Sequence, residues 1–565
     1  MSGNGLARFG VLALGLLALV LPVSGPAGRL AAGDPHRLAE LVAGLWLFKG
    51  LLLAHAVVLA RWAKVSARRA GGALLGSEAL ADSPVTRLEA GIAAGIVALG
   101  LLLRLPGLGE GLWFDEIQTL VEYVRLPFAR IVTTFDSQNQ HLLYTLSAHA
   151  AVAWFGESGW ALRLPAVLFG AASLWAVWRF GRLVAAPREA LLAAALLAAS
   201  YHHVWFSQNA RGYTGLLLWS LLASLCFLRL LAGRPRDGRG WVAGYAGAMA
   251  LAVYTHATAA LVAVAHAAIL LGLVARAGRG AWRGQARAPV AALGLAGSLA
   301  LLLYAPVLPQ LLETLLAKPS GGVTTAWQSP LWLAAEALGG LARGLPGGWM
   351  ALGLGGLVVA AGLASYGRQS GTVLAVMLLP PLVTLAAIVA LGHNLWPRFF
   401  FFAAGFGALI AVRGVFTLAR ALAPARGPAV ATLVTGAGVL ASALTVPRAW
   451  GPKQDYEGAA RFVERELGPA DAAVVVDLTD YPYRRYYGRP WAAVTGAAEL
   501  EAVEQRHART WVLYTFPVRL AAVHPDLWAR LAERYQRVAV FPGTVGGGDI
   551  VIMVSRSPDA SRPPA

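Results

Sequence analysis

Charged residues and cysteines are scarce in this sequence of 565 residues. Only 13% of the residues are charged, whereas a soluble domain carries about 25%, so an ordinary soluble enzyme is excluded. The single cysteine, Cys226, lies in an apolar run and cannot form an internal disulfide. The sequence also lacks an Asn-X-Ser/Thr glycosylation site. Apolar residues dominate instead and make up 57% of the chain, so the fold class must follow from how they are distributed.

These apolar residues fall into runs of membrane-spanning length, and the mean hydropathy is +0.59. We therefore predict a polytopic α-helical membrane protein with about 13 transmembrane helices. A cleaved signal peptide is the alternative for the first run, but a second run follows it closely, so we interpret it as a retained span. The predicted spans cover residues 7–24, 39–61, 88–105, 163–183, 189–206, 212–232, 241–256, 258–275, 288–307, 349–366, 372–391, 398–418 and 428–446.

The net charge of +18 would fit a nucleic-acid-binding protein if the basic residues formed one patch. They instead form clusters between spans, around residues 61–69, 179–188, 229–239, 276–287 and 413–426. Cytoplasmic loops of membrane proteins are rich in Arg and Lys, and placing every cluster in the cytoplasm lets the spans alternate without conflict. This predicts a plasma (inner) membrane protein with a cytoplasmic N-terminus and no nucleic-acid partner.

Two loops on the outer side are long, at residues 106–162 and 309–348. The first contains an apolar segment, residues 140–156, which we interpret as a helix that lies on the membrane or packs in the protein, because a span there would invert the later clusters. Its other helices are expected to turn Leu120, Val121, Val124 and Phe128 toward lipid. Long loops with helices of their own are usually functional.

After residue 446 the sequence has the charge and patterning of a soluble protein. A helix is predicted at 456–467 and strands at 472–476, 511–515, 538–541 and 550–554. The chain thus divides into two extra N-terminal helices with a cytoplasmic linker (1–87), a transmembrane catalytic domain (88–446), an extracytoplasmic α/β domain (447–556) and a disordered tail (557–565).

Two adjacent acids, Asp115 and Glu116, follow the third predicted span in the stretch Gly111-Leu-Trp-Phe-Asp-Glu-Ile-Gln118. A carboxylate beside apolar surroundings can act as a general base. Acids also favour helix N-termini, so a helix cap is the alternative. A divalent-cation site formed by Asp115 and Glu116 with His141 or His256 is conceivable, but no ligand spacing favours it.

Two arginines lie at the outer boundary, against the positive-inside pattern, so each needs an anionic partner. Arg211 stands in Trp205-Phe-Ser-Gln-Asn-Ala-Arg-Gly-Tyr213, and Arg398 follows His393-Asn-Leu-Trp-Pro. The partner could be a loop carboxylate or a bound phosphate, and interfacial anchoring is the alternative. His256, in a predicted turn, and the polar stretch from Asp136 to Tyr144 fall on the same side.

The motifs, and their order along the chain, resemble those of the GT-C superfamily glycosyltransferases. The resemblance is greatest to the family 39-like members, which include protein O-mannosyltransferases, the aminoarabinose transferase of lipid A and rhizobial lipopolysaccharide-core transferases. The resemblance covers about residues 88–420 and rests on 113–116, 136–144, 155–165, 206–213, 254–256 and 397–399.

The resemblance implies an inverting transfer of a sugar from a polyprenyl-phosphate donor to an extracytoplasmic lipid, polysaccharide or protein. It makes Asp115 the base or acceptor-binding residue of the catalytic pair, in which Glu116 is the supporting acid, and it makes Arg211 and Arg398 the donor phosphate-binding residues. It implies no certain cofactor. The substrate-binding candidates are Asp136, Gln140, His141, Tyr144, Gln208, Tyr213 and His256.

Two other functions stay open at this point. A lipid or sugar transporter would have charged residues at mid-membrane and pairs of interrupted transmembrane helices. The polar clusters here lie at one membrane boundary instead. An oligosaccharide polymerase or ligase of similar architecture is the other. The sequence also departs from the family at 140–145, where a His-Pro-Pro-Leu-Tyr-Tyr pattern is common.

Overall fold

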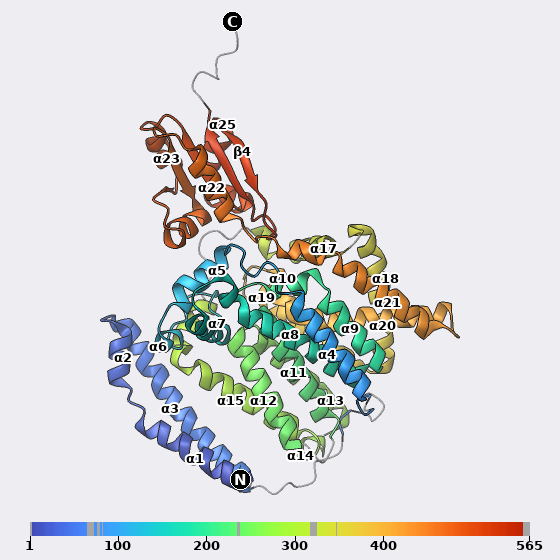
Figure 1. Ribbon diagram of the computed structural model, residues 1–565. Coiled ribbons are helices and arrows are strands. Elements are labelled where there is room, and N and C mark those ends of the chain that lie inside the picture. Colours follow the sequence, from blue (N-terminus) through green and yellow to red (C-terminus); the bar gives the residue numbers. More distant parts are fainter. Residues whose placement is uncertain are drawn as a thin grey trace.

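The computed structural model describes residues 3–64, 73–75, 80–81, 83–233, 238–278, 280–316, 325–345 and 347–556. The predicted disordered tail and parts of the basic clusters around residues 61–69 and 229–239 lie outside the described residues. Figure 1 shows a large helical body with a small sheet-containing domain on one end.

The helical body agrees with the prediction of a polytopic membrane protein. In the described residues, nine helices are long and apolar enough to cross a membrane, or up to eleven if two bent helix pairs are counted as single spans. Two further helices, α4 and α12, coincide in sequence with the two remaining predicted spans, 88–105 and 241–256. The helices of this body are α1 (Gly3–Val20), α2 (Ser24–Ala31), α3 (Pro35–Lys64), α4 (Arg87–Leu102), α8 (Gly159–Val184), α9 (Pro187–Ala198), α10 (Tyr201–Ser207), α11 (Tyr213–Leu231), α12 (Gly238–Thr255), α13 (Ala259–Ala277), α14 (Gly280–Arg283), α15 (Arg287–Tyr304), η3 (Ala305–Val307), α18 (Gly348–Gln369), α19 (Gly371–Ala390), η5 (Pro397–Ala403), α20 (Ala404–Leu422), α21 (Gly427–Ala443) and η6 (Val446–Trp450).

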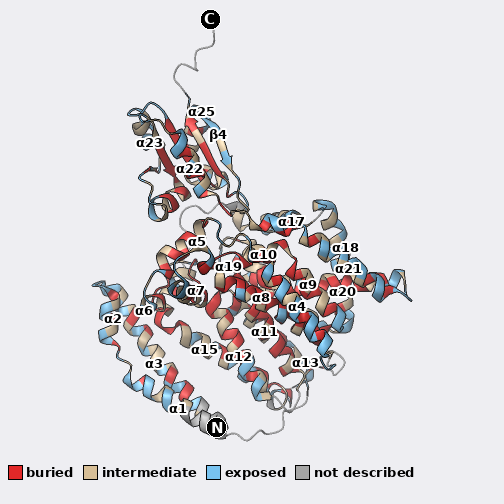
Figure 2. Ribbon diagram, in the orientation of Figure 1, coloured by how far each residue is buried: buried red, intermediate tan, exposed pale blue. Residues whose placement is uncertain are grey.

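The core of the body is centred on α8 and α11. The protein buries 78% of the apolar window of α11 but only 6% of that of α18, so α11 is an inner helix and α18 faces lipid. Figure 2 shows the same contrast between the middle of the body and its flanks. The N-terminal helices α1–α3 form one such flank, where α3 packs closely on η3. A Cβ at Gly44 would lie 2.5 Å from the Ala305 carbonyl oxygen, so only glycine allows this approach.

The long loops contain short helices at the end of the body next to the sheet domain (Figure 1). The segment predicted as a packed or surface helix is α7, which is too short to span and packs on α8. The basic loop around α14 lies at the opposite end of the body. The loop helices are α5 (Phe114–Gln118), the π-helix η2 (Thr119–Val124), α6 (Phe128–Ile131), α7 (Leu142–Phe155), α16 (Leu308–Leu316), η4 (Thr325–Gln328) and α17 (Pro330–Gly344).

The C-terminal domain is built on a five-stranded sheet with the order β2-β1-β3-β5-β4. Strands β2, β1 and β3 are parallel, and β5 runs antiparallel to both of its neighbours. The predicted helix and the four predicted strands are present, whereas the three-residue β2 and the later helices were not predicted. The elements are α22 (Tyr456–Glu466), β1 (Ala472–Val476), η7 (Asp477–Thr479), η8 (Pro482–Tyr486), β2 (Ala492–Val494), α23 (Ala497–Glu504), β3 (Thr510–Tyr514), α24 (Pro517–Val523), α25 (Pro525–Arg534), β4 (Tyr535–Phe541) and β5 (Ile550–Ser555).

The sheet domain shares an apolar core with the first outer loop. Ile117, Leu120 and Val124 belong to the same buried cluster as Tyr483 and Trp511 of the sheet domain. The prediction that Leu120 and Val124 face lipid is therefore wrong, since both are almost fully buried in this cluster, which also contains residues of α7 and α8. Val121 is partly buried against the same cluster. Phe128 is 62% exposed, as a lipid-facing residue would be.

Candidate active site

The two adjacent acids lie in the first turn of α5, which begins at Phe114, and they have different environments. Glu116, in the first turn of α5, points into the protein and is fully buried, whereas the side chain of Asp115 is 14% exposed. Adjacent positions on a helix face different directions, so one acid can serve the fold while the other stays accessible.

Glu116 is enclosed by donors. Arg163 of α8 binds both of its carboxylate oxygens, at 2.8 and 2.5 Å, and the backbone N–H of Ala210 donates to Oε1 at 2.7 Å. Burial alone would raise the pKa of Glu116, but the charges of Arg163 and Lys453 and these hydrogen bonds outweigh it, so the pKa lies below its usual value. Glu116 is thus an anchor that is ionised at neutral pH.

Arg163 extends this anchor into the loop before α5. Its guanidinium also donates to the carbonyl oxygens of Leu108, Glu110 and Gly111, at 2.8–3.1 Å. The pair therefore fixes the segment that carries Asp115 against α8. Sequence reasoning missed Arg163, although it is also an arginine at the outer end of a span, the signal that singled out Arg211.

A second missed residue, Lys453, comes from the linker before the sheet domain. It is buried, and its Nζ donates to the carbonyl oxygen of Gln208 at 2.5 Å and lies over the Trp205 ring. Burial lowers the pKa of Lys453 to about 7, and the charge of Glu116 opposes the decrease. The next residue, Gln454, accepts a hydrogen bond from the Phe114 N–H at 3.1 Å. No local pattern in the sequence signals these contacts.

Asp115 faces Arg398 at the start of η5. Arg398 Nη1 lies 3.2 Å from Asp115 Oδ2, and the guanidinium also stacks on Trp396. The Asp115 carbonyl, not its carboxylate, accepts hydrogen bonds from Thr119 at 2.7 Å and Asn139 at 3.2 Å. The backbone is therefore held in place while the carboxylate keeps accessible surface.

Arg211 and His141 form the wall next to this pair. Arg211 Nη1 donates to the Asn139 carbonyl at 3.0 Å, and the Gly212 N–H donates to His141 Nδ1 at 2.9 Å. A neutral imidazole that accepts at Nδ1 carries its proton on Nε2. Nε2 lies 3.3 Å from Arg211 Nη2, so the imidazole and the guanidinium are in direct contact. Arg211 is therefore held against His141 in the wall beside Asp115.

The histidines of this wall are neutral. Burial holds the pKa of His141 well below its usual value and lowers that of His256 to about 3, and the charges of Arg211 and Arg398 act in the same direction. The two rings lie 4.6 Å apart between centroids, and Tyr213 packs against both. The positive charge of the wall therefore comes from the arginines alone.

Several polar groups around Asp115 are buried without a hydrogen-bond partner among the described residues. They are the Tyr213 hydroxyl, Gln140 Nε2, Arg211 Nε and Arg398 Nε. Buried donors are nearly always satisfied, so a ligand or ordered water is expected beside these groups. Each of these groups can donate to the oxygens of an anion.

The other predicted site residues lie at the edge of this wall or outside it. Asp136 accepts a hydrogen bond from the Tyr123 hydroxyl at 2.7 Å. Tyr144 and Gln208 serve packing instead: the Tyr144 hydroxyl donates to the Leu162 carbonyl at 2.5 Å, and Gln208 Nε2 donates to the carbonyls of Arg104 and Pro106. In the part of the chain that the structure describes, no group of three His, Cys, Asp or Glu side chains is arranged to hold a metal ion.

Residues 142–310 match the model of a family described as dolichyl-phosphate-mannose-protein mannosyltransferase. This match confirms the predicted resemblance for a segment that includes Arg211 and His256. Among solved structures, the chain is similar to ArnT from Cupriavidus metallidurans in the apo state (14% identity, 84% of this chain and 99% of that chain, TM-score 0.45). It is also similar to ArnT bound to undecaprenyl phosphate (14%, 84% and 99%, TM-score 0.43) and to the archaeal oligosaccharyltransferase AglB from Archaeoglobus fulgidus in complex with an inhibitory peptide and a dolichol-phosphate (12%, 84% and 75%, TM-score 0.49). No curated protein sequence matches the chain.

Proposed function

We propose that this chain, whose central segment matches the mannosyltransferase family model, is an inverting membrane glycosyltransferase. It takes a sugar from a polyprenyl-phosphate donor and passes it to a lipid, polysaccharide or protein acceptor. The observation that carries this proposal is the group of buried, unsatisfied donors beside an accessible carboxylate. Such a group suits a phosphate next to a general base.

In the proposed step, Asp115 takes the proton from an acceptor hydroxyl as its oxygen attacks the anomeric carbon of the donor sugar. The bond between that carbon and the phosphate oxygen breaks, and the phosphate keeps the electron pair. Arg398 and the Arg211–His141 wall hold the developing negative charge. Preorganised donors of this kind are a major source of rate enhancement.

Arg398 has a double role in this proposal. In the free protein it neutralises Asp115, and its side chain is still 31% exposed. A bound phosphate competes for the guanidinium and leaves the Asp115 carboxylate free to receive the acceptor proton. Glu116 acts as a positioning residue, because its oxygens are already engaged by Arg163 and Ala210.

Arg398→Gln is expected to raise the donor KM by about 10- to 150-fold while the acceptor KM changes little, since a hydrogen bond to a charged group contributes about 1.5–3 kcal/mol. Steady-state kinetics with purified enzyme and varied donor concentration measures this. Arg489→Gln is the matched control, because Arg489 is 32% exposed and pairs with Glu464 in the sheet domain. A donor KM equal to that of the control would remove Arg398 from the site.

We further propose that the site and the sheet domain face the outer side of the plasma membrane. The basic cluster around Arg276 supports this orientation, because α14 lies at the far end of the body from the sheet domain (Figure 1). A cysteine introduced at Gln138 should react with a membrane-impermeant maleimide in intact cells, whereas one introduced at Arg276 should react only after lysis. The reverse pattern would invert the orientation.

A further inference from the structure

A cleft of about 410 Å³ lies where the sheet domain meets the helical body, outside the site around Asp115. Tyr201 of α10, Arg343 of α17 and Arg448 of η6 line one side of it. The loop between β4 and β5, residues 543–547 with Asp549, lines the other. Its volume falls within the range of small-molecule sites, roughly 300–1,000 Å³.

The glycines of this loop have a structural reason to be present. A Cβ at Gly543 would lie 2.2 Å from the Lys453 carbonyl oxygen, and Gly547 has a φ of +71°, which favours glycine. The loop is held by backbone hydrogen bonds from Thr544 to Pro452 at 3.0 Å and from Val545 to Lys453 at 3.2 Å. One wall of the cleft is therefore a fixed backbone with few side chains.

The charges that line the cleft are mainly positive. Arg343 pairs with Glu336 at 3.3 Å, while Arg448 makes no ion pair with any carboxylate in the described ranges and donates only to the Arg343 carbonyl, at 3.4 Å. The Asp549 carboxylate already accepts from the Gly543 N–H at 2.9 Å. Both nearby carboxylates, Glu336 and Asp549, already accept other hydrogen bonds, so the guanidinium of Arg448, next to Arg343, is left to bind a carboxylate or phosphate.

A single side chain, that of Trp205, lies between the cleft and the segment that carries Asp115. The Thr544 hydroxyl accepts a hydrogen bond from Trp205 Nε1 at 2.8 Å, and the Trp205 ring lies 6.5 Å from that of Trp113. Trp113 is the N-cap residue of α5, two positions before Asp115. The cleft is therefore in contact, through Trp205, with the segment that carries Asp115.

We propose that this cleft binds an anionic saccharide of the acceptor, with a carboxylate or phosphate between Arg343 and Arg448. The proposal rests on the glycosyltransferase function, which requires an acceptor. The donor phosphate has its own donors around Arg398, at the start of η5. The cleft is instead half formed by the extramembrane domain, where a polar acceptor arrives.

The test is a binding titration followed by intrinsic tryptophan fluorescence, since Trp205 and Trp450 lie near the cleft. The probes are tri-galacturonate, glucose 6-phosphate and neutral maltotriose, added to purified full-length protein. We expect an anionic probe to bind, maltotriose to bind at least about tenfold more weakly, and the double variant Arg343→Gln/Arg448→Gln to lose at least about tenfold in affinity for the anionic probe. Tighter binding of tri-galacturonate would identify a carboxylate as the recognised group, and tighter binding of glucose 6-phosphate would identify a phosphate.

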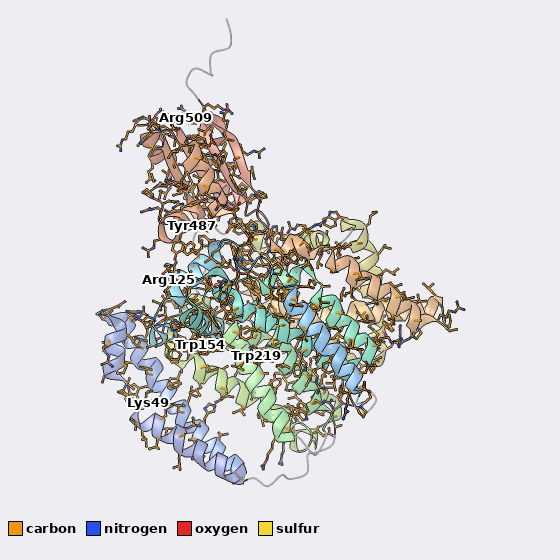
Figure 3. All side chains as sticks on the ribbon, in the orientation of Figure 1. Lys49, Arg125, Trp154, Trp219, Tyr487 and Arg509 are labelled. Atoms are coloured by element: carbon orange, nitrogen blue, oxygen red, sulfur yellow. The ribbon has the colours of Figure 1, made fainter. Side chains whose placement is uncertain are left out.

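The control is Arg509→Gln, which removes an arginine of similar exposure at the far end of the sheet domain (Figure 3). Equal affinity of wild type and double variant for the anionic probes, or equal loss in the control, would overturn the proposal. So would equal binding of maltotriose. Because binding needs no turnover, a cleft that binds in a protein without transferase activity would refute the proposed function while leaving the saccharide site in place.

Discussion

Asp115→Asn is expected to lower the rate of sugar transfer by about 10²- to 10⁴-fold, the usual contribution of a general base. Asparagine has nearly the same shape as aspartate but cannot accept the acceptor proton. The variant should fold, because the Asp115–Arg398 pair is partly exposed and such pairs contribute at most about 1 kcal/mol. The measurement is turnover of a polyprenyl-phosphate sugar by purified enzyme, with thermal unfolding as the check on folding.

The control for this prediction is Glu122→Gln, a charge removal in the same loop. Glu122 accepts a hydrogen bond from the Tyr481 hydroxyl and has no place in the proposed chemistry. Glutamine keeps the acceptor oxygen, so turnover should stay near that of the wild type. Full activity of Asp115→Asn, with a normal control, would eliminate Asp115 as the base.

Arg163→Met should destabilise the protein by about 3–5 kcal/mol, because it leaves the Glu116 carboxylate buried without its main partner. The matched control is Arg125→Met, which breaks the Arg125–Glu157 pair of the same outer region; both side chains of that pair are 42% exposed. Exposed pairs contribute about 0–1 kcal/mol, so this variant should unfold close to the wild type. Figure 3 labels Arg125 near the base of the sheet domain.

The pH dependence of unfolding provides an independent signature of the same pair. In the wild type the pKa of Glu116 is depressed below 4.5, so its contribution to stability is present above that pH and is lost as the pH falls through the folded-state pKa. Without Arg163, burial becomes the dominant influence and raises this pKa. Acidification toward pH 4.5 should then stabilise the variant. Parallel pH profiles of the two proteins would contradict this assignment.

Much of the architecture could be predicted because it follows from local composition. Apolar length identifies a span such as α11, and a short apolar run rich in valine identifies a buried strand such as β1, without knowledge of the partners. The orientation of Leu120 and Val124 could not be predicted this way. Their apolar side chains fit lipid and a protein interface equally well, and the cluster that buries them joins α7 and α8 to a domain more than 330 residues later.

The site was predictable in part for the same reason. Asp115, Arg211 and Arg398 stand out because a charge at a membrane boundary needs a partner, and the structure places Arg398 beside Asp115. The burial of Glu116 and the accessibility of Asp115 were not predictable. The burial of Glu116 depends on Arg163 and on the Ala210 backbone, which approach Glu116 from 47 and 94 residues away.

The hydrogen bond from the Phe114 N–H to Gln454 joins groups 340 residues apart. At a synthesis rate of about 5–20 residues per second, the ribosome takes roughly 20–70 s to make the second group after the first. During that interval the nascent chain inserts its spans with the Asp115 segment not yet braced by Lys453 and Gln454. Arg163 can hold the segment that carries Asp115 early in synthesis, whereas its hydrogen bond to Gln454 forms only after the last span has been made.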